Sequence, residues 1–126
     1  LHLQTGDFAQ AKLVRVTQGA IFDVAVDLRK ESPTFSQWYG TVLSEKNKNS
    51  LYIPRGFAHG LYVLEDATVV YKCDQFYSKD HDVSISWNDK NINVEWPLIP
   101  SLDVTLSEKD LKAMSLEDYK SHYLGD

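Results

Sequence analysis

A histidine between two glycines, in the stretch Ile53-Pro54-Arg55-Gly56-Phe57-Ala58-His59-Gly60, is the most informative feature of this chain. Four further ionisable residues, His2, Lys12, Tyr71 and Asp110, are of types that can move protons next to a carbonyl group. Such chemistry needs a base that removes a carbon-bound proton, a group that holds the enolate oxygen and an acid that returns the proton. Side chains alone can supply all three, so the set indicates proton transfer without a metal ion or cofactor.

Each of these residues also has an ordinary structural interpretation. A histidine near a terminus is commonly a surface residue, and a lysine in a strand is commonly exposed. Tyr71 follows Val69-Val70 and can be a core tyrosine, whereas Asp110 follows Ser107 closely enough to be a carboxylate at a helix start. The residues taken singly therefore leave both interpretations open.

Composition limits the class of protein. With 126 residues, of which 43% are hydrophobic, the chain has enough material for one core, and we expect a single domain over residues 1–126. The single cysteine, Cys73, excludes an internal disulfide and favours a reducing, cytoplasmic compartment. No apolar run is long enough for a membrane span, and a net charge of -5 disfavours nucleic acid as a partner. Because the first residue is Leu1 and not methionine, we expect a processed or trimmed chain.

Short runs rich in β-forming residues dominate the first 75 positions. Residues 12–17 and 20–28 predict a hairpin with a turn at Gln18-Gly19, and the alternation in the second run predicts a half-buried strand. Further strands are expected at residues 37–43, 50–53, 60–64 and 67–74, with Glu65-Asp66 as a turn. Ser107 predicts the start of a C-terminal helical segment. The pattern indicates an all-β sandwich or barrel.

Several separated motifs, in order, resemble the dTDP-4-dehydrorhamnose 3,5-epimerase family. They are Leu1 to Gln4, Lys12 to Val16, Phe22 to Arg29, Ser32 to Phe35, Ile53 to Gly60, Tyr71 to Cys73 and Leu106 to Asp110. The resemblance implies a cupin-type jelly-roll β-sandwich with a short C-terminal helical segment, assembled as a homodimer. It also implies that N-terminal strands usual in the family, including an arginine that contacts the substrate phosphate, are missing before Leu1.

The resemblance assigns roles to individual residues. His2 is the base, Asp110 orients its ring, Lys12 stabilises the enolate and also contacts substrate, and Tyr71 is the acid on the opposite face. His59, Tyr77, Asp82 and Lys109 are expected to bind the sugar nucleotide, with Tyr77 stacked on the thymine ring. The implied reaction is epimerisation of dTDP-4-keto-6-deoxyglucose at C3 and C5, on the route to dTDP-L-rhamnose for polysaccharide biosynthesis, with no cofactor and no metal.

Three alternatives are weighed beside this assignment. A metal-dependent cupin is disfavoured because no closely spaced His-x-His pair occurs. A non-catalytic sugar-nucleotide-binding jelly roll has no need of an acid and a base, although the fold alone is compatible with it. An epimerase acting at only one carbon fits the same residues, because regioselectivity depends on fine placement in the pocket.

Overall fold

The computed structural model describes residues 1–125. Its strands are β1 (His2–Gln4), β2 (Lys12–Asp27), β3 (Trp38–Ser44), β4 (Ser50–Ile53), β5 (Phe57–Cys73) and β6 (Asp82–Ser84). Its helical segments are η1 (Gly6–Phe8), η2 (Lys79–His81), α1 (Glu108–Leu111), α2 (Leu116–Tyr119) and η3 (Lys120–Leu124). The prediction of an all-β chain with a short C-terminal helical segment is confirmed.

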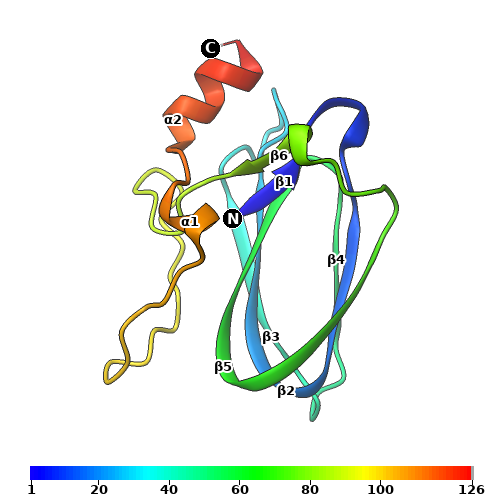
Figure 1. Ribbon diagram of the computed structural model, residues 1–126, viewed down its shortest axis with the longest axis vertical. Helices are drawn as coiled ribbons and strands as arrows, with labels where there is room; N and C mark the ends of the chain where they lie inside the picture. The colour runs from blue at the N-terminus through cyan, green and yellow to red at the C-terminus, as the bar shows by residue number, and fades with distance from the viewer. Residues whose placement is uncertain (126) are drawn as a thin grey trace.

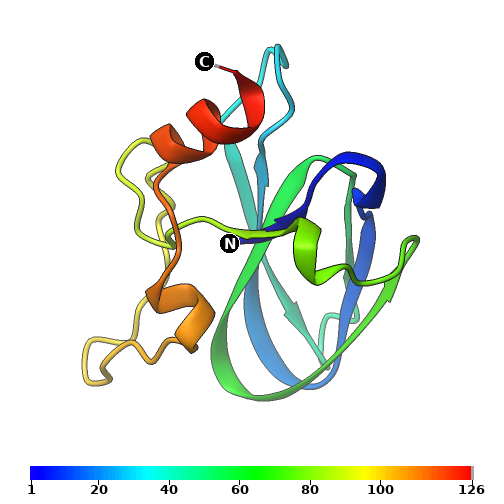
Figure 2. The ribbon, with the colours of Figure 1, turned by 45° about the horizontal axis from the view of Figure 1, so that its top comes forward.

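The strands form one six-stranded antiparallel sheet in the order β3-β2-β5-β1-β6. β4 pairs with the first residues of β2, Lys12 to Arg15, and β3 pairs with the second half of β2. The sheet is strongly curled, with β2 and β5 running together along its whole length (Figure 1). The segment of residues 88–125 lies along one side of the curled sheet (Figure 2). Among the described residues, none of the helices is long and apolar enough to span a membrane.

The predicted hairpin at Gln18-Gly19 is wrong. Residues 12–27 form one continuous strand that pairs with β5 from Lys12↔Cys73 to Asp27↔Phe57. Gly19 lies where the register shifts, and it has a φ of +77°. The glycine therefore makes a bulge that bends the strand instead of a turn that reverses it. The predicted turn at Glu65-Asp66 is wrong for the same reason, since these residues lie inside β5 at the same bend.

From Ile21 to Asp27, β2 is largely buried on both faces, which corrects the prediction of a half-buried strand in this stretch. Val24 and Val26 pack into a core shared with β1, β6 and the C-terminal segment. Ile21 and Ala25 pack into a second core inside the curl, with residues of β3 and β4. The side chains that alternate along this part of β2 therefore face two different cores, and neither face is turned to solvent.

The remaining predicted strands are close to those observed. The run at residues 50–53 coincides with β4, and the run at 37–43 corresponds to β3. At the predicted helix start, the Ser107 hydroxyl accepts a hydrogen bond from the backbone N–H of Asp110 at 3.2 Å, so Ser107 is the N-cap of α1. This cap fixes the part of the chain that carries Lys109 and Asp110.

Candidate active site

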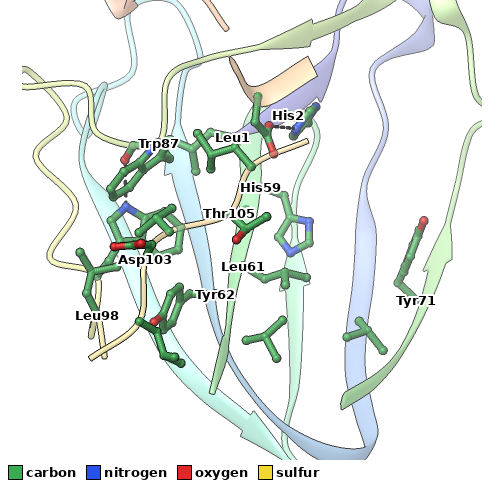
Figure 3. A pocket seen from close by; sticks show the side chains of 18 of the residues that line it. Leu1, His2, His59, Leu61, Tyr62, Tyr71, Trp87, Leu98, Asp103 and Thr105 are labelled. Carbon is green, nitrogen blue, oxygen red and sulfur yellow. Dashed lines mark hydrogen bonds and ion pairs between the residues drawn. The ribbon is translucent and has the colours of Figure 1, made fainter. Parts of the chain in front are cut away.

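A cavity of about 700 Å³ opens between the curled sheet and the segment after β6. His2, Lys12, His59, Tyr71 and Asp110 all line it, although they come from β1, β2, β5 and α1. The structure therefore brings together all four residues predicted to be catalytic, of which Lys12 was also predicted to contact substrate, and one further predicted binding residue, His59. Figure 3 shows how the labelled side chains surround this space.

Both ring nitrogens of His2 have partners. Nε2 lies 2.6 Å from Oδ1 of Asp110, and Nδ1 lies 3.0 Å from the hydroxyl of Ser84. Ser84 is directly opposite His2 in the β1–β6 pair, so strand register places its hydroxyl beside the ring. Burial lowers the pKa of His2, while the hydrogen bond and charge of Asp110 act in the opposite direction. The ring is thus held in place by a carboxylate and a hydroxyl, and its burial favours the neutral form.

Lys12 and Tyr71 lie in the β2–β5 pair and differ in exposure. Burial lowers the pKa of the Lys12 ammonium, which makes its proton easier to release to a nearby oxygen. Tyr71 is 58% exposed, so it is not a core tyrosine. In Figure 3 its ring stands apart from His2 and His59, on the far side of the open space. The group expected to act as acid is therefore separated from the group expected to act as base.

His59 belongs to a second histidine–carboxylate pair. Its Nε2 lies 2.5 Å from Oδ1 of Asp23, a residue of β2 that is fully buried. The second oxygen of Asp23 has no hydrogen-bond partner among residues 1–125. The sequence interpretation missed Asp23, although an acidic residue within the apolar run of β2 was a usable sign. Aspartates are almost never fully buried unless they are paired.

Tyr77, Asp82 and Lys109 form a cluster beside the cavity. The Lys109 ammonium donates to Oδ2 of Asp82 at 2.6 Å and to the Tyr77 hydroxyl at 3.1 Å, and it lies 5.3 Å from the centre of the Tyr77 ring. The Asp82 carboxylate raises the pKa of Lys109 above its ordinary range. The structure therefore joins these three predicted binding residues to each other, but none of them lines the cavity itself.

Much of the cavity wall was not identified from the sequence. Leu61 and Tyr62 of β5, Trp87, Trp96 and Asp103 contribute to it. The Tyr62 hydroxyl accepts a hydrogen bond from the backbone N–H of Ile99 at 3.0 Å, which attaches the irregular segment after Trp96 to the sheet. No periodic pattern marks that segment, so only the folded chain identifies it as a wall.

Within residues 1–125, no three histidine, cysteine or acidic side chains are grouped closely enough to hold a metal ion. The donors that a metal would need are instead divided between the two histidine–carboxylate pairs. The site as built can take up and release protons at two imidazole rings, one ammonium group and one phenol.

Comparisons with known proteins show which proteins this chain resembles. A family model described as dTDP-4-dehydrorhamnose 3,5-epimerase matches residues 1–118. The dTDP-4-dehydrorhamnose 3,5-epimerase of Shigella flexneri is 52% identical over 119 residues, which are 94% of this chain and 64% of that protein. The chain thus spans just under two thirds of the length of this curated relative.

Solved structures are similar as well. The dTDP-6-deoxy-D-glucose-3,5-epimerase of Legionella pneumophila, in complex with dTDP-4-keto-L-rhamnose, is 47% identical with a TM-score of 0.88, over 93% of this chain and 61% of that one. A 3'-monoepimerase from Streptomyces bikiniensis, in complex with dTDP-quinovose, is 30% identical with a TM-score of 0.87, over 98% and 61%. The likeness to epimerases of this fold confirms the predicted cupin-type jelly roll.

Proposed function

This chain belongs to the dTDP-4-dehydrorhamnose 3,5-epimerase family, and from that membership we propose that it epimerises dTDP-4-dehydro-6-deoxy-D-glucose at C3 and C5. The product is dTDP-4-dehydro-L-rhamnose, a precursor of dTDP-L-rhamnose for polysaccharide biosynthesis. The observation that carries the proposal is the His2–Asp110 pair, which lines the cavity together with Lys12 and Tyr71.

The proposed chemistry follows from the placement of these residues around the cavity and from the lowered pKa values of His2 and Lys12. A proton on a carbon next to the C4 ketone is acidic enough for a neutral imidazole to remove it when the resulting enolate is stabilised. His2 takes that proton, and Asp110 stabilises the imidazolium that forms. Lys12 interacts with the enolate oxygen, and its lowered pKa suits a group that shares a proton with this oxygen. Tyr71 returns a proton from the side away from His2, which inverts the carbon.

The remaining predicted residues hold the nucleotide and the sugar. His59, whose Nε2 is bound to Asp23, lines the cavity and has Nδ1 left for a hydrogen bond with a sugar hydroxyl. Tyr77 offers an exposed ring on which thymine can stack, and the Lys109–Asp82 pair holds that ring from one side. No cofactor enters this scheme.

Assembly and location are part of the proposal. We infer that the protein works as a homodimer in the cytoplasm, where nucleotide sugars are made. Exposed apolar side chains of the sheet that lie outside the cavity, such as Val42 and Val70 at 41% and 38%, support a surface that is covered in the assembly. Light scattering at several protein concentrations tests the dimer.

The test of activity is proton NMR of dTDP-4-dehydro-6-deoxy-D-glucose in deuterium oxide with this protein. Loss of the C3 and C5 proton signals is expected, and His2→Ala should remove this exchange while leaving a folded chain. No exchange by a folded protein that binds dTDP would contradict the proposed reaction and favour a non-catalytic binding module.

An epimerase acting at only one carbon is the second candidate. The similarity to the Streptomyces bikiniensis 3'-monoepimerase, at 30% identity, supports it. Exchange at C3 alone in the same NMR experiment would select this function over the double epimerase.

A further inference from the structure

The loop between β5 and η2, residues 74–78, carries the ring that the proposed function assigns to the nucleobase. Tyr77 in this loop is 62% exposed and the preceding Phe76 is 85% exposed, so side-chain packing does little to fix them. A stacking platform must nevertheless have a defined orientation, because freezing a mobile ring on binding costs affinity. The Lys109–Asp82 pair holds the ring of Tyr77 from one side, and the loop that carries the ring has to be fixed by contacts to its backbone.

Gln4 of β1 supplies those contacts. Its side chain is nearly buried, at 5% exposure, and its amide reaches the residues on both sides of Tyr77. Nε2 donates to the carbonyl oxygen of Phe76 at 3.0 Å, and the backbone N–H of Ser78 donates to Oε1 at 2.8 Å. Nε2 also donates to the carbonyl oxygen of Phe8 at 2.8 Å.

The orientation of this amide is fixed by its partners. Turning the amide over would place its oxygen against two carbonyl oxygens and its nitrogen against the Ser78 N–H. Both amide hydrogens and the amide oxygen are thus used by a single arrangement. A glutamine serves here because it alone combines two donors and an acceptor at this reach.

The same short strand carries the expected base. His2 lies two residues before Gln4 in β1, and Gln4 is directly opposite Asp82, the acidic partner of Lys109. One strand therefore determines the positions of the proton-transfer centre and of the nucleobase platform.

We propose that Gln4 is a positioning residue for the nucleobase: it clamps the backbone on either side of Tyr77 and so holds the ring ready for a pyrimidine nucleoside diphosphate. This inference rests on the proposed function, because it takes dTDP as the ligand class. Gln4 itself does not touch the ligand, since it does not line the cavity and its polar atoms are occupied by the chain.

The test is a double-mutant cycle on dTDP affinity, measured by calorimetry. Gln4→Met, which keeps the length of the side chain, should weaken dTDP binding about 5- to 10-fold when Tyr77 is present. In a Tyr77→Ala background the same change should weaken it less than about 2-fold, because the ring to be positioned is gone. Gln10→Met is the matched control, since Gln10 donates to the carbonyl oxygen of Gln75 at 2.6 Å but does not flank Tyr77.

A merely structural role would give a different result. Equal losses of affinity with and without Tyr77 would overturn the inference, and so would an unchanged affinity in folded Gln4→Met. Turnover should show a raised KM with little change in kcat, and hydrogen exchange of the Ser78 amide should accelerate. If Gln4→Met does not fold, Gln4→Glu serves, because it keeps the acceptor for Ser78 and removes both donors.

The outcome is separable from that of the proposed reaction. A wild-type protein that binds dTDP but exchanges no substrate protons contradicts the epimerase, while the cycle still decides the role of Gln4. A protein that binds no dTDP overturns the inference about Gln4 directly.

Discussion

His59 and Asp23 lie side by side across the β2–β5 pair, with 2.5 Å between Nε2 and Oδ1, and Asp23 has no exposed surface. The register places Ala25, not Asp23, directly opposite His59, so the contact is a diagonal one between neighbouring strands. The imidazole is the only hydrogen-bond partner that the carboxylate has among the described residues. The pair therefore couples the stability of the sheet to the geometry of the cavity.

Removing His59 should destabilise the fold strongly. His59→Leu leaves the Asp23 carboxylate buried without a partner, and breaking a buried pair in this way costs about 3–5 kcal/mol. The double variant with Asp23→Asn should recover part of that loss, because no charge is then buried. Urea unfolding followed by circular dichroism measures both. Equal stability of the single and double variants would show that Asp23 is not the source of the loss.

Replacing Asp110 by asparagine should change the pH dependence of activity. His2 must be neutral to act as a base, and burial places its pKa below the ordinary value of 6.5. Asp110 opposes that shift, so Asp110→Asn should lower the pKa of His2 further and move the acid limb of kcat/KM to lower pH. The rate at pH 8 should also fall about tenfold or more, because the imidazolium loses its carboxylate.

The matched control for this prediction is Asp118→Asn, which removes a carboxylate of α2 that lies outside the cavity. In Asp118→Asn the acid limb of kcat/KM should remain that of the wild type.

The lowered pKa of His2 also affects stability, because the folded chain binds fewer protons at His2 than the unfolded chain does. Stability from this group is therefore present above pH 6.5 and is lost as the pH falls through the pKa of folded His2.

Tyr71→Phe should separate the two halves of the reaction. In the proposed mechanism proton removal depends on His2, so deuterium should still enter the substrate, whereas inversion should slow about 100-fold or more without the acid. Deuterium exchange and product formation are measured in parallel by NMR, and the ratio of the exchange rate to the inversion rate is compared with that of the wild type. Tyr52→Phe is the control, since Tyr52 is similarly exposed, at 62%, but lies on β4 outside this cavity. An unchanged ratio in Tyr71→Phe would remove Tyr71 from the proposed mechanism.

Gly19 should tolerate no side chain. A Cβ there would lie 1.9 Å from the carbonyl oxygen of Asp66, and its φ of +77° adds strain of about 1–2 kcal/mol for alanine. Gly6 has a similar φ of +61°, but its nearest neighbour would be 4.0 Å away. Gly19→Ala should therefore lower the free energy of unfolding by clearly more than Gly6→Ala in urea titrations. Equal losses would mean that the bend at Gly19 opens readily.

The sequence alone predicted strand content better than strand continuity. Gly19 followed by an alternating run is typical of a hairpin, and the carbonyl of Asp66, which lies against Gly19 at the bulge, comes from 47 residues further along. Similarly, the motifs placed His2, Lys12, Tyr71 and Asp110 in one site, and the cavity contains them all. Asp23 was missed because its pairing with His59 can be recognised only once the register of β2 and β5 is known.

The separation of His2 and Asp110 by 108 positions has a consequence for the chain as it is synthesised. Among the described strands, β1 pairs with β5 at His59 and with β6 at Ser84, so His2 cannot pair until these later strands have been made. Proteins whose contacts join residues far apart in the sequence tend to fold slowly. A ribosome-bound chain that has not yet released residue 110 has no complete proton-transfer pair. If substrate proton exchange is measured on nascent chains of increasing length, we expect it to appear almost in one step, at the length that allows Asp110 to reach His2.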